Sequence, residues 1–360
     1  MEMIMAEDIY LKLRERLDTY ALGYPETESG VEIRILKKIF TEREAELFLH
    51  LGLSLETVES VAEKAGTDPE SLLAELETMA KNGVLFRYRK GDITRYSATP
   101  YMVGFYEYQL DTMDEELAGL TEAYFKEGML NSISTAVNPL RTIPVNESID
   151  ASMQIAPYAD ARKIIKNANR IAVARCICRV QQEKLNSSCD KPQEVCFSFG
   201  SHADYYVENG LGRYIDEQEA LALLARSEKE GLVAQPGSTI NPGGMCNCCG
   251  DCCGILRALQ LTPRPADLVM NKYFAVIDPD ECTGCETCLD RCQMNAISIT
   301  ENDLAAIQLE RCIGCGLCVT TCPGEAISMK TKPESEFTAI PESGMDLVLK
   351  TAKKRGISPF

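Results

Sequence analysis

The sequence predicts a multi-domain α+β protein, and three observations lead to that fold class. The chain has 360 residues, enough for two or three domains with separate cores at roughly 100–200 residues per domain. All 17 cysteines lie between Cys176 and Cys322, and none lies in the first half. A segment of about 30 residues is repeated near the C-terminus. We expect a helical domain over 1–128, a linker over 129–150, a cysteine-rich α/β domain over 151–270, a repeat domain over 271–332 and a tail over 333–360.

The composition excludes several classes of protein. Charged residues make up 25% and hydrophobic residues 45% of the chain, which excludes wholesale disorder. The net charge of −17 opposes general nucleic-acid binding, because phosphate contacts need a basic surface. The N-terminus carries charges from Glu2 onward and lacks a signal-peptide core, and no stretch approaches the ~18 apolar residues of a membrane span. We therefore expect a cytoplasmic protein without membrane contact, whose reduced cysteines bind metal.

The first half predicts helices followed by a hairpin. Apolar periodicity predicts helices over Val31–Phe40, from Thr41 onward, over Ser54–Ala65 and over Pro69–Lys81. Thr41 and Glu44 have capping-box spacing, and Thr67 or Asp68 can cap the last helix. The β-branched and aromatic runs around Lys90-Gly91-Asp92 predict a hairpin.

This order of elements, over about residues 30–100, resembles a winged helix-turn-helix domain. The resemblance implies that the helix Pro69–Lys81 enters a DNA major groove. That helix carries Glu70, Glu75 and Glu77 against the single base Lys81, so protein contacts are favoured over DNA binding. The hairpin holds the basic residues of this region, which are Arg87, Arg89, Lys90 and Arg95.

Two segments connect this region to the cysteine-rich part. The pattern over Tyr101–Lys126 predicts one long helix. The segment Asn131–Ile149, with Pro139 and Pro144, predicts a linker laid over the surface.

Two copies of the pattern C-x2-C-x2-C-x3-C carry the strongest chemical signal. They span Cys282–Cys292 and Cys312–Cys322, and an Ala-Ile-Ser strand follows each copy. Three thiolates on one tight loop can reach three irons of a cubane cluster, and Gly284, Gly314 and Gly316 let the loop bend around it. A zinc module is the alternative, but zinc sites usually use two C-x2-C pairs or histidines.

These runs, over about residues 272–332, resemble the bacterial two-cluster ferredoxins. The resemblance implies two [4Fe–4S] clusters, with the fourth cysteine of each run serving the other cluster. Cluster one would bind Cys282, Cys285, Cys288 and Cys322, and cluster two would bind Cys292, Cys312, Cys315 and Cys318. Gln293 departs from the family pattern, which has proline after the fourth cysteine, as at Pro323. Because proline is not a ligand, this departure leaves the ligand assignment unchanged. It affects the local bend of the backbone and the environment of cluster two.

The remaining nine cysteines (17 minus 8) predict one or two further iron–sulfur clusters in the middle domain. They are Cys176, Cys178, Cys189, Cys196, Cys246, Cys248, Cys249, Cys252 and Cys253. Two clusters with four thiolates each would leave one thiol spare. One grouping puts the first four cysteines on one cluster and four of the last five on another. A mixed grouping is equally compatible with the sequence.

Local patterns place these cysteines near strand and helix ends. A strand over Arg170–Ala174 leads into Arg175-Cys176-Ile-Cys178-Arg179, and helices are predicted over His202–Val207, from Glu217 to about Lys229 after Asp216, and from Ile255 to Gln260. Arg175 and Arg179 either offset the negative charge of a cluster or are solvated loop charges. His202 is expected to be structural rather than a ligand.

Two further resemblances concern the cysteine-rich region and the whole chain. Cys248-Cys249-Gly250 and Cys252-Cys253-Gly254 are similar to the Cys-Cys-Gly motif of heterodisulfide-reductase-type subunits. The whole chain resembles multi-cluster iron–sulfur proteins of anaerobic bacteria. The sequence has no motif for nucleotide or flavin binding and no catalytic triad pattern.

The expected function is transfer of single electrons between a soluble donor or acceptor and a partner oxidoreductase in anaerobic metabolism. The chain would act as a carrier or a subunit of a complex or homo-oligomer, rather than as a stand-alone enzyme, and its partners would be redox proteins. One alternative is a redox-responsive winged-helix transcription regulator. Another is an iron–sulfur oxidoreductase with catalysis at the middle cysteines.

Overall fold

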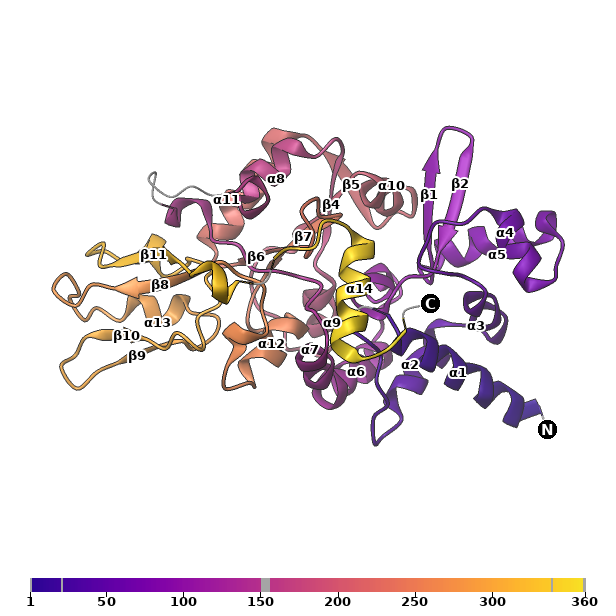
Figure 1. The fold of residues 1–360 in the computed structure, drawn as a ribbon, viewed down its shortest axis with the longest axis horizontal. Helices are drawn as coiled ribbons and strands as arrows, with labels where there is room; N and C mark the ends of the chain where they lie inside the picture. The colour runs from indigo at the N-terminus through magenta and orange to yellow at the C-terminus, as the bar shows by residue number, and fades with distance from the viewer. Residues whose placement is uncertain (1, 21, 150–155, 338, 359–360) are drawn as a thin grey trace.

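The computed structural model describes residues 2–20, 22–149, 156–337 and 339–358. The molecule is elongated, and its parts follow one another along the longest axis (Figure 1). Helices from the N-terminal half lie at one end, a sheet with helices lies in the middle, and two small sheets lie at the other end. Within the described ranges, no helix is long and apolar enough to cross a membrane.

Side-chain caps mark the start of three of the five N-terminal helices. These helices are α1 (Glu2–Asp18), α2 (Val31–Ile39), α3 (Glu42–Leu49), α4 (Val58–Ala65) and α5 (Pro69–Lys81). Thr41 and Glu44 form the predicted capping box before α3. The α4 helix begins four residues later than predicted, because Thr57 caps it and Glu56 is held in a β-bridge with Tyr96.

The predicted hairpin is confirmed as β1 (Phe86–Lys90) and β2 (Ile93–Ser97), which pair antiparallel. The order of four helices and a hairpin therefore occurs as expected, whereas membership in the winged-helix family stays a prediction. The hairpin stands beside a helix of the middle part, α10 (Ser201–Glu208), as Figure 1 shows. The Tyr205 hydroxyl of α10 donates to the carbonyls of Ala80 and Leu85, each at 2.8 Å, and so fixes this contact.

The prediction of one long helix over Tyr101–Lys126 is wrong. Residues 101–109 form irregular turns, and a regular helix, α6 (Glu115–Tyr124), begins only after Asp114. The Asp114 side chain accepts the backbone N–H of Leu117 at 2.8 Å, which is an N-cap in the middle of the predicted helix. Helical backbone then continues into α7 (Leu130–Thr135), inside the segment predicted as a linker.

Residues 138–145 of that segment are buried and do not lie over the surface as predicted. Its backbone N–H groups at Arg141 and Ile143 donate to the carbonyls of Pro236 and Ala234, at 3.0 and 3.2 Å. The segment thus extends the edge of the middle sheet, where prolines such as Pro144 are tolerated because one side of an edge strand needs no N–H donor.

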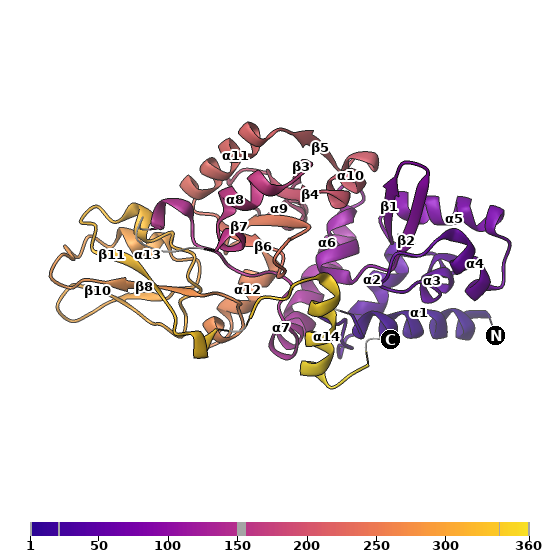
Figure 2. The ribbon, with the colours of Figure 1, turned by 45° about the horizontal axis from the view of Figure 1, so that its top comes forward.

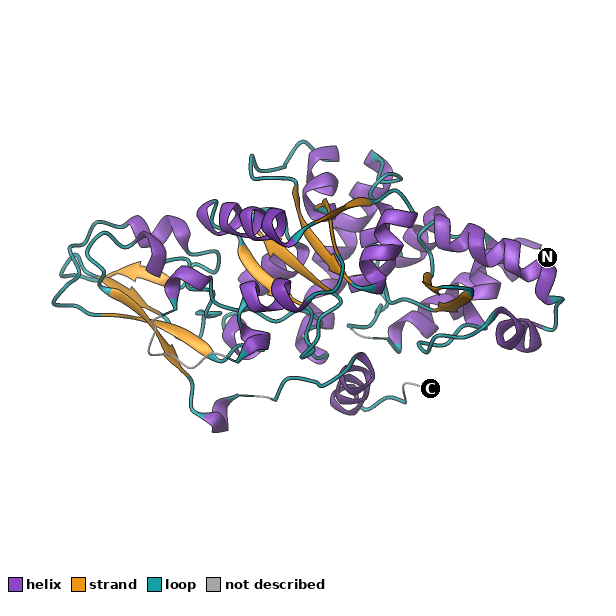
Figure 3. Cartoon of the chain, turned by 90° about the horizontal axis from the view of Figure 1, so that it is seen from above, coloured by secondary structure: helices purple, strands orange, loops and turns teal. Residues whose placement is uncertain are grey.

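The middle sheet differs from the predicted α/β pattern. Its strands are β3 (Ile171–Arg175), β4 (Glu194–Phe199), β5 (Gly212–Ile215), β6 (Val233–Pro236) and β7 (Gly244–Cys248). They are arranged in the order β5-β3-β4-β7-β6, and every described pair is antiparallel. Helices lie beside this sheet (Figure 3), and α10 and α11 (Glu217–Lys229) contact its strands. The other helices of the middle part are α8 (Ala161–Asn167), α9 (Ile177–Lys184) and α12 (Gly254–Gln260). The predicted cap of Asp216 on α11 is confirmed by its 2.8 Å bond from the Glu219 N–H.

The C-terminal module consists of two antiparallel strand pairs and a short helix (Figure 2). Its elements are β8 (Tyr273–Ile277), α13 (Thr287–Arg291), β9 (Ile297–Ile299), β10 (Ala305–Ile307) and β11 (Ile327–Thr331). The sequence beyond it, predicted as a tail, forms α14 (Gly344–Arg355), which returns to the N-terminal helices (Figure 1). Arg355 of α14 pairs with Asp18 of α1 at 2.9 Å.

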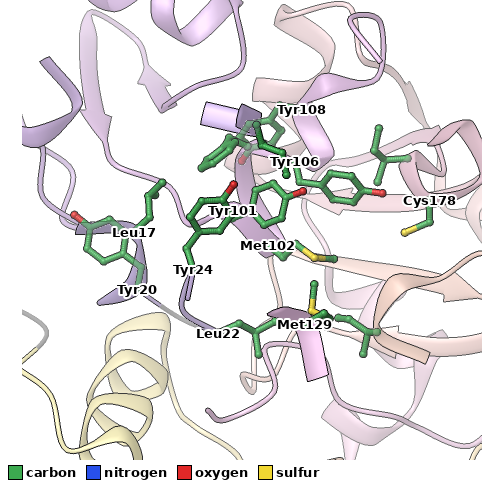
Figure 4. Packing of buried hydrophobic residues seen from close by; sticks show 14 of the residues in the cluster. Leu17, Tyr20, Leu22, Tyr24, Tyr101, Met102, Tyr106, Tyr108, Met129 and Cys178 are labelled. Atoms are coloured by element: carbon green, nitrogen blue, oxygen red, sulfur yellow. The ribbon is translucent and has the colours of Figure 1, made fainter. Parts of the chain in front are cut away.

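A buried aromatic core joins the N-terminal helices to the cysteine-rich part. The rings of Tyr24 and Tyr124 lie 4.8 Å apart, and Tyr101 packs against both. Figure 4 shows this core continuing through Tyr106 toward Cys178. The Tyr106 hydroxyl hydrogen-bonds to the Gln181 side-chain oxygen at 2.5 Å, so the core ends at the helix that carries Cys178.

Candidate iron–sulfur sites

Four cysteines line one cavity at the outer end of the C-terminal module. This first set consists of Cys282, Cys285, Cys288 and Cys322. Cys288 is buried on α13, whereas Cys285 is exposed. Gly284 has φ +66°, and a Cβ there would overlap the carbonyl oxygen of Asp303, so the loop needs glycine to approach the neighbouring backbone.

A second set lines another cavity, closer to the middle sheet. It consists of Cys292, Cys312, Cys315 and Cys318. Backbone N–H groups point at two of its sulfurs: Ala296 donates to Cys292 at 3.2 Å and Ala275 donates to Cys312 at 3.5 Å. Each run therefore contributes its fourth cysteine to the cavity of the other run, the arrangement that the ferredoxin resemblance implies. That these thiols bind iron remains a prediction from their number, softness and common cavity.

Gln293, the departure from the ferredoxin pattern, connects the second set to the middle domain. Its side-chain oxygen accepts the backbone N–H of Gly250 at 2.6 Å, and its side-chain nitrogen donates to the Gly231 carbonyl at 3.2 Å. Its own carbonyl accepts the side chain of Gln260 at 2.8 Å. A proline here could make neither side-chain bond, so the substitution supplies a contact between the two parts.

Two arginines reinforce the same junction through backbone carbonyls. Arg291 donates to the carbonyls of Glu228 and Lys229 at the end of α11, at 2.9 and 3.0 Å. Arg311 donates to the carbonyl of Gln260, the last residue of α12, at 3.2 Å, and to that of Thr262 at 2.8 Å. The C-terminal module is thus bound to the middle domain on both sides of the second set.

Three of the nine middle cysteines form a compact group. The sulfurs of Cys189, Cys249 and Cys252 lie within 4.8 Å of one another, with Cys189 at 3.6 Å from each of the other two. We call them the three-thiol group. Its members come from the loop before β4 and from the turn between β7 and α12. Three soft ligands on one side of a small volume suit a metal site with one position left for another ligand.

The other six middle cysteines form a second group, the six-thiol group. It consists of Cys176, Cys178, Cys196, Cys246, Cys248 and Cys253. The Cys178 thiol interacts electrostatically with those of Cys176 and Cys253. The Cys246 thiol interacts in the same way with those of Cys196 and Cys248, and the Cys248 thiol also with that of Cys253. The group is therefore a connected series of neighbouring thiols near the ends of β3, β4 and β7 and the start of α9 and α12.

Neighbouring thiols and burial raise the pKa values of most thiols in the six-thiol group. Donating a hydrogen bond to Cys178 raises the pKa of Cys176, and donating one to Cys196 raises the pKa of Cys246; burial adds to both shifts. Several neighbouring thiolates would repel one another in this buried volume, so the ionised forms need positive charge among them. Iron in a cluster would supply that charge.

Arg179 lies between the two groups and is fully buried. Its guanidinium donates to the carbonyls of Pro192 and Asn247 at 3.0 and 3.3 Å, and its Nε has no partner among the described residues. Burial lowers the pKa of Arg179, but the nearby thiols, Cys176 first, outweigh this and raise it. No carboxylate among the described residues pairs with this buried cation, so an anionic metal–thiolate centre would balance its charge.

The middle cysteines thus lie in a mixed arrangement. Cys189 lies with Cys249 and Cys252 and not with Cys176, Cys178 and Cys196. Of the flanking arginines, Arg179 lies among the thiols, whereas Arg175 pairs with Asp111 at 3.2 Å on the surface. His202 stacks on Phe86 with ring centroids 4.8 Å apart, in the structural role expected for it. The sequence marks Gln293 as unusual but does not indicate its partner Gly250, because that contact joins two domains.

Comparison with known proteins supports the assignment of the C-terminal module. A family model described as a 4Fe-4S dicluster domain matches residues 275–329, which contain both cysteine runs. Neither a curated protein nor a solved structure matches the chain. The chain is therefore a mixed α and β protein with a C-terminal ferredoxin-type 4Fe–4S domain, which supports iron–sulfur cluster binding and a role in electron transfer.

Proposed function

We propose that this protein passes single electrons between a soluble redox partner and a second oxidoreductase, in the setting of anaerobic metabolism. The observation that carries the proposal is the 2.6 Å bond between Gln293 and the N–H of Gly250. Gln293 follows Cys292 of the second set, and Gly250 follows Cys249 of the three-thiol group. The cysteine sets are thereby linked in a row from the outer end of the C-terminal module to the middle domain.

The cysteines would hold the redox centres. The first and second sets would each hold one [4Fe–4S] cluster, and the middle groups would hold one or two further iron–sulfur centres. When bound, such clusters supply reversible one-electron exchange at iron. The N–H donors of Ala296 and Ala275 would stabilise negative charge on Cys292 and Cys312, which favours the reduced state and raises the potential at the second set.

The outer end of the module would receive the redox partner. Cys285 is exposed there, and the exposed carboxylates of Asp280, Glu281 and Glu286 lie beside it in the sequence. A partner with a basic surface fits this acidic rim, and its association should weaken as salt concentration rises.

The experiment that tests the proposal is anaerobic purification with iron and sulfide counts, followed by electron paramagnetic resonance during stepwise reduction. About twelve to sixteen irons per chain, with signals beyond those of the C-terminal module, are expected. About eight irons, all lost in the double variant Cys288→Ser/Cys318→Ser, would show that the middle cysteines hold no cluster and would refute the proposed row.

A second candidate function is catalysis at the middle cysteines. The favouring observation is that the three-thiol group offers one thiolate fewer than a fully protein-ligated [4Fe–4S] cluster uses. An added small iron ligand such as cyanide should then change the resonance signal that Cys189→Ser removes, and leave the signals of the C-terminal module unchanged. Unchanged spectra for all centres would argue for electron transfer alone.

Transcription regulation has less support. Arg87 and Arg89, two of the basic residues of the hairpin, both pair with Glu77 and with Glu208, at 2.6–2.9 Å. Arg87 is only 6% exposed. These cations are engaged by carboxylates of α5 and α10, so they are poorly placed to neutralise phosphate. Sequence-specific footprints at physiological salt would reverse this preference.

A further inference from the structure

A small cavity with an unusual charge balance lies apart from the cysteine sets. It has a volume of about 60 Å³ and lies between the edge segment 141–143, residues 156–159 and the start of β8. Arg141 and Lys272 line it together with Tyr158, and none of the described residues that line it is an aspartate or glutamate. Among the described side chains, the cavity therefore has two cationic ones and no anionic one.

Arg141 is the more constrained of the two cations. It is 1% exposed, and two of its guanidinium nitrogens donate to the carbonyls of Gly237 and Thr239, at 3.2 and 3.3 Å. The third nitrogen, Nη1, is buried without a hydrogen-bond partner among the described residues. The guanidinium carbon lies 5.9 Å from the centre of the Tyr158 ring, which forms another wall of the same cavity. Burying a guanidinium that has an unpaired N–H donor and no paired carboxylate lowers the stability of the fold unless an anion binds to it.

The other walls define what kind of anion fits. Ile143, Ala159 and Phe337 supply apolar surface, and the Lys272 ammonium lies 5.8 Å from the centre of the Phe337 ring. A volume of about 60 Å³ accommodates several non-hydrogen atoms, since one water needs about 10–15 Å³ on this measure. A multiply charged, strongly hydrated phosphate would have to lose its water against the apolar walls. A carboxylate with a short hydrocarbon tail matches both the cations and the apolar surface.

We propose that this cavity is a binding site for a small aliphatic carboxylate, whose oxygens take the free Nη1 donor of Arg141 and the ammonium of Lys272. The site does not depend on the proposed electron transfer, because none of the candidate cluster ligands lines it.

The test is calorimetric titration of the cluster-loaded full chain with butyrate, with butyramide as the uncharged isostere and inorganic phosphate as the competing anion. Butyrate is expected to bind, and butyramide and phosphate are expected to bind at least about tenfold more weakly, because the carboxylate charge and the apolar tail both contribute. Equal binding of butyramide, or tighter binding of phosphate, would overturn the proposal.

Two variants localise the site. Lys272→Met removes a half-buried cation with little effect on packing, and should weaken butyrate binding about tenfold, whereas the control Lys90→Met in the distant hairpin should leave it unchanged. Arg141→Lys keeps the charge and loses the guanidinium fork, and should weaken binding by a similar factor. Thermal unfolding without ligand shows whether Arg141→Lys is folded; if it is not, the Lys272→Met result decides. Unchanged butyrate affinity in Lys272→Met would overturn the assignment.

Discussion

At the scale of single residues, Gln293 connects the first cysteine run to the middle domain. Proline at this position would end the cysteine run without contacting anything beyond it, whereas glutamine bonds to Gly250 and Gly231 of the middle domain. Replacing Gln293 by Ala should cost about 1–3 kcal/mol of the docking between the two parts, because partly buried N–H and C=O groups lose partners. Reduction of the middle centres through the C-terminal module should slow accordingly.

Stopped-flow reduction with a slow, one-electron donor, monitored at both sets of signals, measures this effect. Gln308→Ala is the matched control, because Gln308 is an exposed glutamine of the same module. Equal rates for Gln293→Ala and Gln308→Ala would contradict a role of Gln293 in coupling the two parts.

Glu107 is a buried carboxyl whose charge opposes folding. Burial raises the pKa of Glu107 to about 8, although its oxygen accepts the Gly104 N–H at 2.7 Å. Since the folded pKa lies above the unfolded one, folding takes up a proton between about pH 4.5 and 8, and stability falls as pH rises through that range. Glu107→Gln keeps an acceptor for Gly104 and removes the ionisation. It should raise stability at pH 8 by at least about 1 kcal/mol and leave it nearly unchanged at pH 4.5, as judged from thermal unfolding. A variant that is equally affected at both pH values would rule out this explanation.

At the scale of elements, local rules predicted the capped helices well. The caps of Thr41, Asp68 and Asp216 depend only on residues two or three positions away, and all three occur. The prediction of one helix over Tyr101–Lys126 was wrong because the apolar residues at its start belong to irregular turns around an aromatic core. Tertiary packing stabilises these turns against the helix propensity of the sequence. The edge segment around Arg141 was missed for a related reason, since its partner β6 lies about ninety residues away.

Glu122 connects three helices at the boundary of the cysteine-rich region. This α6 carboxylate pairs with Arg257 of α12 at 2.5 Å and accepts Gln182 of α9 at 2.9 Å. The hydrogen bond from Arg257 lowers the pKa of Glu122 to about 2. Because the folded pKa lies below the unfolded one, its stabilisation is complete above about pH 5 and is lost as pH falls toward 2.

Glu122→Gln should therefore lower stability by about 1–2 kcal/mol at pH 7, allowing for solvent screening of this partly buried pair. The difference from the parent protein should shrink as the pH is lowered from 5 to 3, in thermal unfolding followed by circular dichroism. Glu116→Gln, on the exposed side of the same helix, is the control. A deficit that stays constant down to pH 3 would show that the carboxylate charge is not its cause.

At the scale of the whole molecule, the grouping of the cysteines in the C-terminal module was predictable and that of the middle cysteines was not. The repeated runs carry their own spacing, so Cys292 and Cys322 could be placed in advance in the opposite cavities. The middle cysteines come together only when β4, β7 and the ends of α9 and α12 meet. No rule of sequence spacing predicts that the Cys189 thiol lies beside those of Cys249 and Cys252 rather than beside the cysteines nearest to it in the sequence.

That tertiary arrangement leads to a sharp prediction, because cysteines adjacent in sequence belong to different groups. Cys248 and Cys253 belong to the six-thiol group, whereas their neighbours Cys249 and Cys252 belong to the three-thiol group. Side chains of successive residues at the end of a strand point to opposite sides, which separates Cys248 from Cys249.

If each group holds its own iron–sulfur centre, Cys249→Ser and Cys252→Ser should alter one resonance signal, and Cys248→Ser and Cys253→Ser should alter the other. A loss of about four irons per chain is expected where a centre fails to assemble, with the signals of the C-terminal module retained. Each pair of variants controls the other for position, charge and size, so identical spectra from Cys252→Ser and Cys253→Ser would mean that the nine thiols serve a single centre.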